Sequence, residues 1–161
     1  MNRKIFLLIL SAFFVLQINA REKKEANVPS YDVVCAGSGS SGSYLIKVVA
    51  IVENSEDIGN EAVQKCAVHG VLFKGFIGGN GCTSQRAMLE GPDVELEHKD
   101  FFDSFFREGL YKNYAMVVDG SLRSERYLGN FKVSAVISVS KDQLRSYMER
   151  AGIVKSLSTG F

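Results

Sequence analysis

A ten-residue apolar run and the amphipathic segment after it constrain the fold most. Residues 43–52 are mainly β-branched or aromatic with one charge, Lys47, which predicts a strand buried on both faces or nearly so. From Asn54, apolar residues recur at helical spacing as far as Gly70, where the helix should end. The segment 71–77 is again rich in β-branched and aromatic residues and predicts a second strand. A strand, a helix and a strand in this order predict a βαβ unit with parallel strands.

The rest of the chain adds strands and helices in no regular alternation. The strand expected at 131–139 has apolar and polar residues in turn, so one of its faces should be buried. The other expected elements are strands at 31–36 and 114–118, an exposed hairpin arm at 122–128, and helices at 101–109 and 140–152. This order predicts an α+β fold of two layers, in which helices cover one face of a mixed β-sheet that contains the βαβ unit.

The first twenty residues follow the plan of a secretory signal peptide. A basic start with Arg3 and Lys4 precedes an apolar run over 5–16, and the segment ends on the small residue Ala20. The run is too short to cross a bilayer core, which takes about 20 apolar residues. The predicted organisation is a signal peptide at 1–20, a flexible segment at 21–30 and one α+β domain at 31–161.

Composition bounds the compartment and the partners of the processed chain. The first cysteine, Cys35, is too far from the apolar run to anchor a bacterial lipoprotein, so we expect export to the periplasm or beyond. Removal of Arg3 and Lys4 with the leader changes the formal charge from +1 to −1. Near neutrality argues against a nucleic-acid binder, which would carry a basic stripe. No later segment is long enough to span a membrane, and no motif indicates a cofactor.

Three cysteines make an odd set. In an oxidising compartment, Cys35, Cys66 and Cys82 predict one disulfide and one free thiol. Any of the three pairings is possible from the sequence, and three buried reduced thiols are equally compatible with it.

A glycine-rich loop follows the predicted strand at 71–77. Gly78, Gly79, Asn80 and Gly81 open a segment of roughly twenty residues, and loops of such length are often functional. The segment lacks the Gly-Lys-Ser/Thr ending of a phosphate-binding loop, so a turn is favoured. We expect these four residues to form a loop that contacts a binding partner.

The same loop supplies a candidate catalytic set. Cys82 and His98 combine a nucleophile with a base, and Asp100 or Asp103 is placed to orient the imidazole. This combination predicts a small thiol-dependent hydrolase. The competing interpretation is that Cys82 is paired in a disulfide, which would remove the nucleophile.

Two residues of the predicted first helix are candidate metal ligands. Cys66 and His69 are three positions apart and would lie one turn apart on the same helix face. Another cysteine or histidine of the chain would have to complete the site. In the competing interpretation, Cys66 packs in the apolar stripe and His69 flanks the helix end.

Four phenylalanines define one face of the second predicted helix. Phe101, Phe102, Phe105 and Phe106 have the spacing of a single helical face. Large apolar residues on an amphipathic helix usually face inward, so we expect this face in the core, with an exposed partner surface as the alternative.

Two stretches together resemble a known class of domains. One is the helix ending in Ala-Val-Gln-Lys-Cys-Ala-Val-His-Gly at 62–70, followed by Val-Leu-Phe, and the other is the strand and helix over 131–152. They resemble small α+β domains of bacterial envelope accessory proteins, as in flagellar-assembly and outer-membrane lipoprotein families, and uncharacterised exported proteins of Bacteroidetes type. The chain departs from the lipoprotein members because it lacks their anchor cysteine. The resemblance implies assembly or scaffolding and carries over no catalytic residue.

These observations lead to one expected function and two alternatives. We expect an exported envelope protein with a non-enzymatic binding or assembly role, whose partners are other envelope proteins or a second copy of itself. The alternatives are a thiol-dependent hydrolase built on Cys82 and His98, and a metal- or ligand-binding module built on Cys66 and His69.

Overall fold

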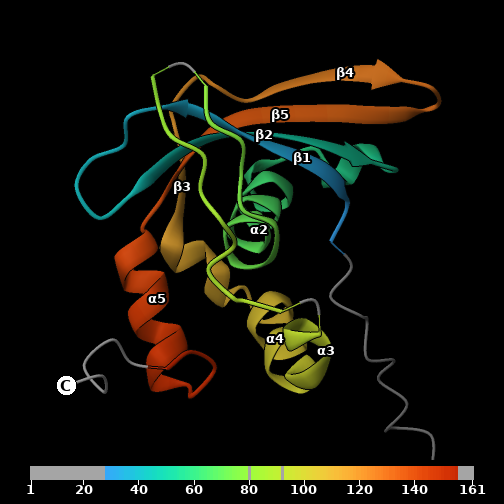
Figure 1. The fold of residues 1–161 in the computed structure, drawn as a ribbon. Helices are drawn as coiled ribbons and strands as arrows, with labels where there is room; N and C mark the ends of the chain where they lie inside the picture. Colours follow the sequence, from blue (N-terminus) through green and yellow to red (C-terminus); the bar gives the residue numbers. More distant parts are fainter. Residues whose placement is uncertain (1–27, 80, 92, 156–161) are drawn as a thin grey trace, which may run out of the picture.

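The structure is a five-stranded antiparallel sheet with helices on one side (Figure 1). The computed structural model describes residues 28–79, 81–91 and 93–155, so the predicted signal peptide lies outside the described residues. The strands are β1 (Ser30–Gly37), β2 (Tyr44–Val52), β3 (Ala115–Val117), β4 (Arg123–Tyr127) and β5 (Asn130–Val139). The sheet order is β1-β2-β5-β3, and β4 pairs with the other half of the same β5 edge.

The helices lie together below the sheet in Figure 1. They are α2 (Asn60–His69), α3 (Val94–Glu97), α4 (Lys99–Arg107) and α5 (Lys141–Arg150), with short turns η1 (Ser55–Asp57), η2 (Gly70–Lys74) and η3 (Leu110–Tyr114). The α+β class, with helices covering one sheet face, is therefore confirmed.

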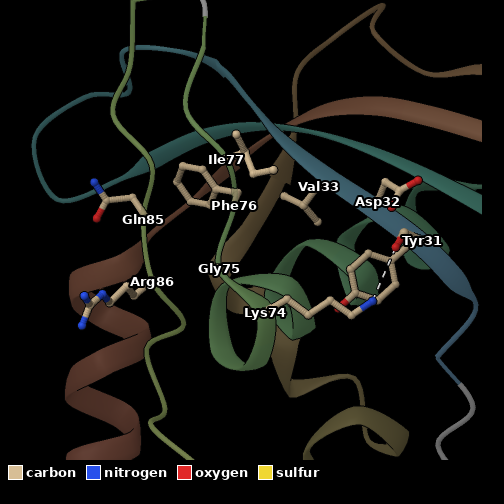
Figure 2. A pocket seen from close by; sticks show the side chains of 9 residues that line it. All are labelled: Tyr31, Asp32, Val33, Lys74, Gly75, Phe76, Ile77, Gln85 and Arg86. Atoms are coloured by element: carbon tan, nitrogen blue, oxygen red, sulfur yellow. Dashed lines mark hydrogen bonds between the residues drawn. The ribbon is translucent and has the colours of Figure 1, made fainter.

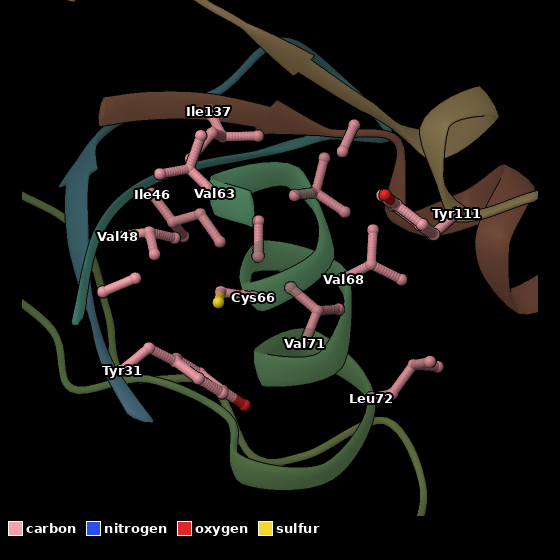
Figure 3. Packing of buried hydrophobic residues seen from close by; sticks show 14 of the residues in the cluster. Tyr31, Ile46, Val48, Val63, Cys66, Val68, Val71, Leu72, Tyr111 and Ile137 are labelled. Carbon is pink, nitrogen blue, oxygen red and sulfur yellow. The ribbon is translucent and has the colours of Figure 1, made fainter. Parts of the chain in front are cut away.

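The core fills the space between the sheet and α2 (Figure 3). Alternate residues of β2 and β5, among them Ile46, Val48 and Ile137, are fully buried against Val63 and Cys66 of α2. This alternation corrects the expectation that the run at 43–52 is buried on both faces. Its other face is exposed or partly exposed, because no helix of the described chain covers that side.

The predicted strand at 71–77 does not form. Gly70 keeps helical angles, and the chain continues from α2 as one π-helical turn that buries Val71 and Leu72. A helical conformation is favoured over an extended one here because it places both side chains in the core. Gly75, with φ +71°, ends the turn. A parallel contact remains as a single bridge between Val34 and Ile77, so the predicted βαβ unit is wrong. The five strands pair antiparallel throughout, in place of the predicted mixed sheet.

The C-terminal half follows the sequence closely. The predicted strand at 131–139 is β5, and the helix after Ser140 is α5. The arm at 122–128 becomes β4, which is exposed along its whole length. In the phenylalanine face, Phe102, Phe105 and Phe106 are buried, which confirms its core position.

Candidate functional site

The glycine-rich loop is the tip of a narrow hairpin. Phe76 and Gln85 exchange backbone hydrogen bonds of 2.9 Å, and Gly79 and Cys82 exchange bonds of 3.0 and 3.1 Å. A Cβ at Gly78 would lie 2.6 Å from the Cys82 carbonyl oxygen, so the second hairpin arm leaves room only for glycine there. The predicted partner loop is thus an ordered β-like hairpin. Asn80 lies outside the described residues.

A disulfide joins this hairpin to β1. Cys82 is bonded to Cys35, and Cys66 is free and buried. A disulfide-bonded sulfur has no thiolate to act as a nucleophile. His98 and Asp100 lie at the α3–α4 junction, whereas Figure 1 shows the hairpin tip at the opposite end of the molecule. The structure therefore does not assemble the predicted catalytic set, because its thiol is cross-linked and its base is remote.

The candidate metal ligands also point to different environments. Cys66 is fully buried in the core, and burial raises the pKa of its thiol to about 12, which keeps it protonated. His69 instead bonds to residues of β1 and α3. Across 28–79, 81–91 and 93–155, no group of three potential ligand residues is placed to hold a metal ion. The predicted metal site is therefore not formed.

His69 is the centre of a partly buried hydrogen-bond chain. The Tyr31 hydroxyl lies 2.5 Å from its Nδ1, and its Nε2 lies 3.1 Å from Glu95. Burial raises the pKa of Tyr31, so the hydroxyl keeps its proton and donates to Nδ1. The tautomer that satisfies both partners then carries its proton on Nε2, which donates to Glu95. Burial also lowers the pKa of His69, although the Glu95 carboxylate opposes this shift.

A pocket of about 410 Å³ lies beside this chain, along the outer edge of β1 (Figure 2). It is lined by Tyr31, Asp32, Val33, Lys74, Gly75, Phe76, Ile77, Gln85 and Arg86. Figure 2 shows β1 on one side and the two hairpin arms on the other, with Lys74 extended across the ring of Tyr31. Its Nζ lies 3.8 Å from the ring centroid and donates to the Tyr31 carbonyl at 3.5 Å.

The backbone of β1 faces this pocket. The Cys35 amide donates to the Ile77 carbonyl at 3.2 Å, so it points away from β2. In an antiparallel strand, the backbone groups of every second residue point the same way. The amide of Val33 consequently borders the pocket, whereas its carbonyl faces Ile77 in the parallel bridge between Val34 and Ile77. The edge of β1 is thus paired at Cys35 and borders the pocket at Val33.

The charges of the pocket suit an acidic ligand. Lys74 and Arg86 are exposed cations, and Gln85 adds an amide. Asp32 is the single carboxylate among the lining residues. Val33, Phe76 and Ile77 provide apolar walls.

Sequence reasoning missed this site because its parts come from three distant segments. Lys74 offered one signal, as the sole charge in the predicted strand at 71–77. Arg86 and Val33 carried no comparable signal. Their proximity depends on the hairpin and on its disulfide to β1.

Comparison with known proteins adds no information on function, so the functional argument rests on the geometry of the site. No protein-family model, no curated protein and no solved structure matches this chain. None of the helices in the described part of the chain has the length and apolar character needed to cross a bilayer.

Proposed function

We propose that this protein is an exported, non-enzymatic binding module that takes an extended acidic segment of another envelope protein along β1. The observation that carries the proposal is the pocket, which is lined by a strand edge, apolar side chains and two cations. An extended peptide pairs with such an edge through its own backbone, and side-chain pockets add selectivity.

The ligand class follows from the two kinds of contact. The outward amide at Val33 can donate to a backbone carbonyl of an added strand. Lys74 and Arg86 favour a carboxylate, either from an Asp or Glu side chain or from a chain terminus. A volume of about 410 Å³ suits a short peptide segment.

Two observations support the exported compartment. The disulfide between Cys35 and Cys82 is of the kind that persists in oxidising surroundings. The N-terminal sequence has the basic, apolar and small-residue plan of a signal peptide.

The test is selection of short peptides from a random phage-displayed library, followed by calorimetry with the selected peptides. We expect acidic peptides whose binding shifts the NMR signals of Val33 and Ile77. Val33→Pro removes the outward amide, which edge strands tolerate, and should weaken binding about tenfold or more. Val33→Ala keeps the amide and should bind within about threefold of the wild type.

Charge reversal provides the second arm of the test. Arg86→Glu should weaken binding about tenfold, because a carboxylate ligand would then face a carboxylate. Arg107→Glu, an equally exposed arginine on α4, is the matched control and should have no effect. Selected peptides that bind equally well to Val33→Pro and Arg86→Glu would refute the proposal, as would a selection that yields no binder.

A further inference from the structure

The sheet face opposite the helices is open. On β2 and β5, alternate residues point away from α2, and those residues are exposed or partly exposed. Figure 1 shows the helices of the described chain on the other side of the sheet. We call this surface the outer face. It comprises the outward residues Asp32, Val34, Leu45, Lys47, Val49, Ile51, Met116, Val118, Arg123, Glu125, Lys132, Ser134, Val136 and Ser138.

A row of apolar residues, interrupted by Lys47, crosses the outer face from edge to edge. Strand register places Val34 beside Lys47 and Lys47 beside Val136. The row continues to Ile77 through its bridge with Val34. At the other edge it reaches Val118, whose amide donates to the Val136 carbonyl at 2.8 Å.

The apolar members of this row are open to solvent. Ile77 is 76% exposed, Val34 is 44% exposed and Val118 is 39% exposed. In the adjacent row, Met116 is 68% exposed. Several exposed apolar side chains gathered on one sheet face are typical of an interaction surface.

A second row of the outer face, next to the row of Val34 and Val136, has opposite charges at its two ends. Register places Asp32 beside Val49, Val49 beside Ser134, and Ser134 beside Arg123. Asp32 and Arg123 are three strand spacings apart, about 14 Å, so they do not pair within one chain. The outer face thus carries an acid at its β1 edge and a base at its β4 edge.

We propose that the outer face is the interface of a two-fold symmetric homodimer of this chain. The two-fold axis lies between the two packed sheets, runs parallel to the strands and passes over the gap between β2 and β5. It exchanges the two edges of the sheet. It therefore places Asp32 of each copy opposite Arg123 of the other, and Val34 opposite Val118. The two edges of the outer face are then complementary in charge, and Val34 and Val118 make an apolar contact.

The dimensions of the outer face suit a modest dimer. Four strands about 4.8 Å apart and about 30 Å long present roughly 500 Å² on each copy. Two such faces packed about 10 Å apart bury roughly 1,000 Å², the lower limit for a specific interface. Lys47 meets Val136 of the other copy, and its long aliphatic stem covers apolar surface.

The test is a charge swap read by sedimentation velocity. The 161-residue chain is expressed, and the protein is purified with its disulfide intact. The wild type should dimerise at concentrations below about 100 µM. Asp32→Arg and Arg123→Asp should each weaken dimerisation about tenfold, because each places like charges opposite one another.

The double variant distinguishes this arrangement from general loss of affinity. Asp32→Arg combined with Arg123→Asp restores opposite charges across the axis and should return the dissociation constant to within about threefold of the wild type. Glu97→Arg, on exposed α3, is a charge-matched control and should have no effect. Val136→Lys should weaken the dimer independently of the charge pair.

The outcomes are decisive in both directions. A wild type that stays monomeric, a dimer insensitive to the single variants, or a double variant no better than either one overturns the proposal. The inference does not depend on peptide binding, because Lys74 and Arg86 are absent from the outer face, and Arg86→Glu should leave the dimer unchanged.

Discussion

At the scale of single residues, the local surroundings of His69 are unlike those expected for a helix end. It lies between Tyr31 of β1 and Glu95 of α3, beside the rings of Phe73 and Phe106. Its side chain is 12% exposed. The sequence correctly put His69 at the end of the helix. Its two hydrogen-bond partners, 38 and 26 positions away, could come only from the tertiary fold.

This environment predicts acid sensitivity. The pKa of His69 is lowered on folding, so the unfolded chain binds the proton more tightly, and the free energy of unfolding should fall as pH drops below about 6.5. The neighbouring Lys74 cation acts in the same direction, and the Glu95 carboxylate acts against it. Urea unfolding between about pH 5 and pH 8 measures the slope.

The second histidine provides the control for this prediction. The chain has two histidines, so His69→Gln should flatten the pH dependence and His98→Gln should leave it in place. An unchanged slope in His69→Gln would assign the acid sensitivity to other groups.

Leu128 is a residue under backbone strain. It has φ +48° and is followed by Gly129 with φ +85°, so the two form the type I′ turn between β4 and β5. Leu128 is also 87% exposed, so it gains little burial in exchange. Asparagine adopts this conformation more readily than leucine.

Leu128→Asn should therefore raise the free energy of unfolding by about 1 kcal/mol. Leu96→Asn is a suitable control, because Leu96 is 72% exposed but lies in helix α3. That substitution should be neutral or slightly destabilising. Denaturant unfolding measures the free energy of unfolding of both variants. If both substitutions raise it equally, the loss of an exposed leucine, and not the relief of backbone strain, explains the gain in stability.

At the scale of elements, the hairpin over 75–86 depends on its attachment to β1. One backbone bond, from Cys35 to Ile77, and one disulfide hold it there. The disulfide closes a sequence separation of 47 residues. Chain-entropy arguments give a cross-link of this span roughly 4 kcal/mol of stabilisation.

Removing the cross-link with Cys35→Ala and Cys82→Ala together should lower the free energy of unfolding by about 2–5 kcal/mol. Reductant should bring the wild type to the level of the double variant and leave the double variant unchanged. Cys66→Ala serves as the control, since it keeps the disulfide and its reductant response. A wild type unaffected by reductant would show that the cross-link contributes nothing to stability.

The elements that sequence predicted well share one property, which is a buried face visible in local periodicity. β5, α5 and the phenylalanine face of α4 all have it. The segment 71–77 failed because a short apolar run has no distinguishing period. Its helical continuation from α2 was decided by the space available in the core beneath the sheet.

At the scale of the whole molecule, one sheet separates two surfaces of different use. The helices and the core occupy one side, and the outer face occupies the other. The pocket lies at the β1 edge, where Asp32 borders both the pocket and the outer face. A dimer through the outer face would carry two pockets and would gain avidity for a ligand with two acidic segments.

The sequence by itself determined the α+β class, the alternating burial of β5 and the core role of α2 and α4, because periodicity follows from local geometry. Tertiary structure decided which cysteines pair, how β1 and the hairpin frame a pocket, and where Asp32 and Arg123 lie on the outer face. Those relations join residues distant in sequence. They depend on strand register and helix packing, which no local pattern specifies.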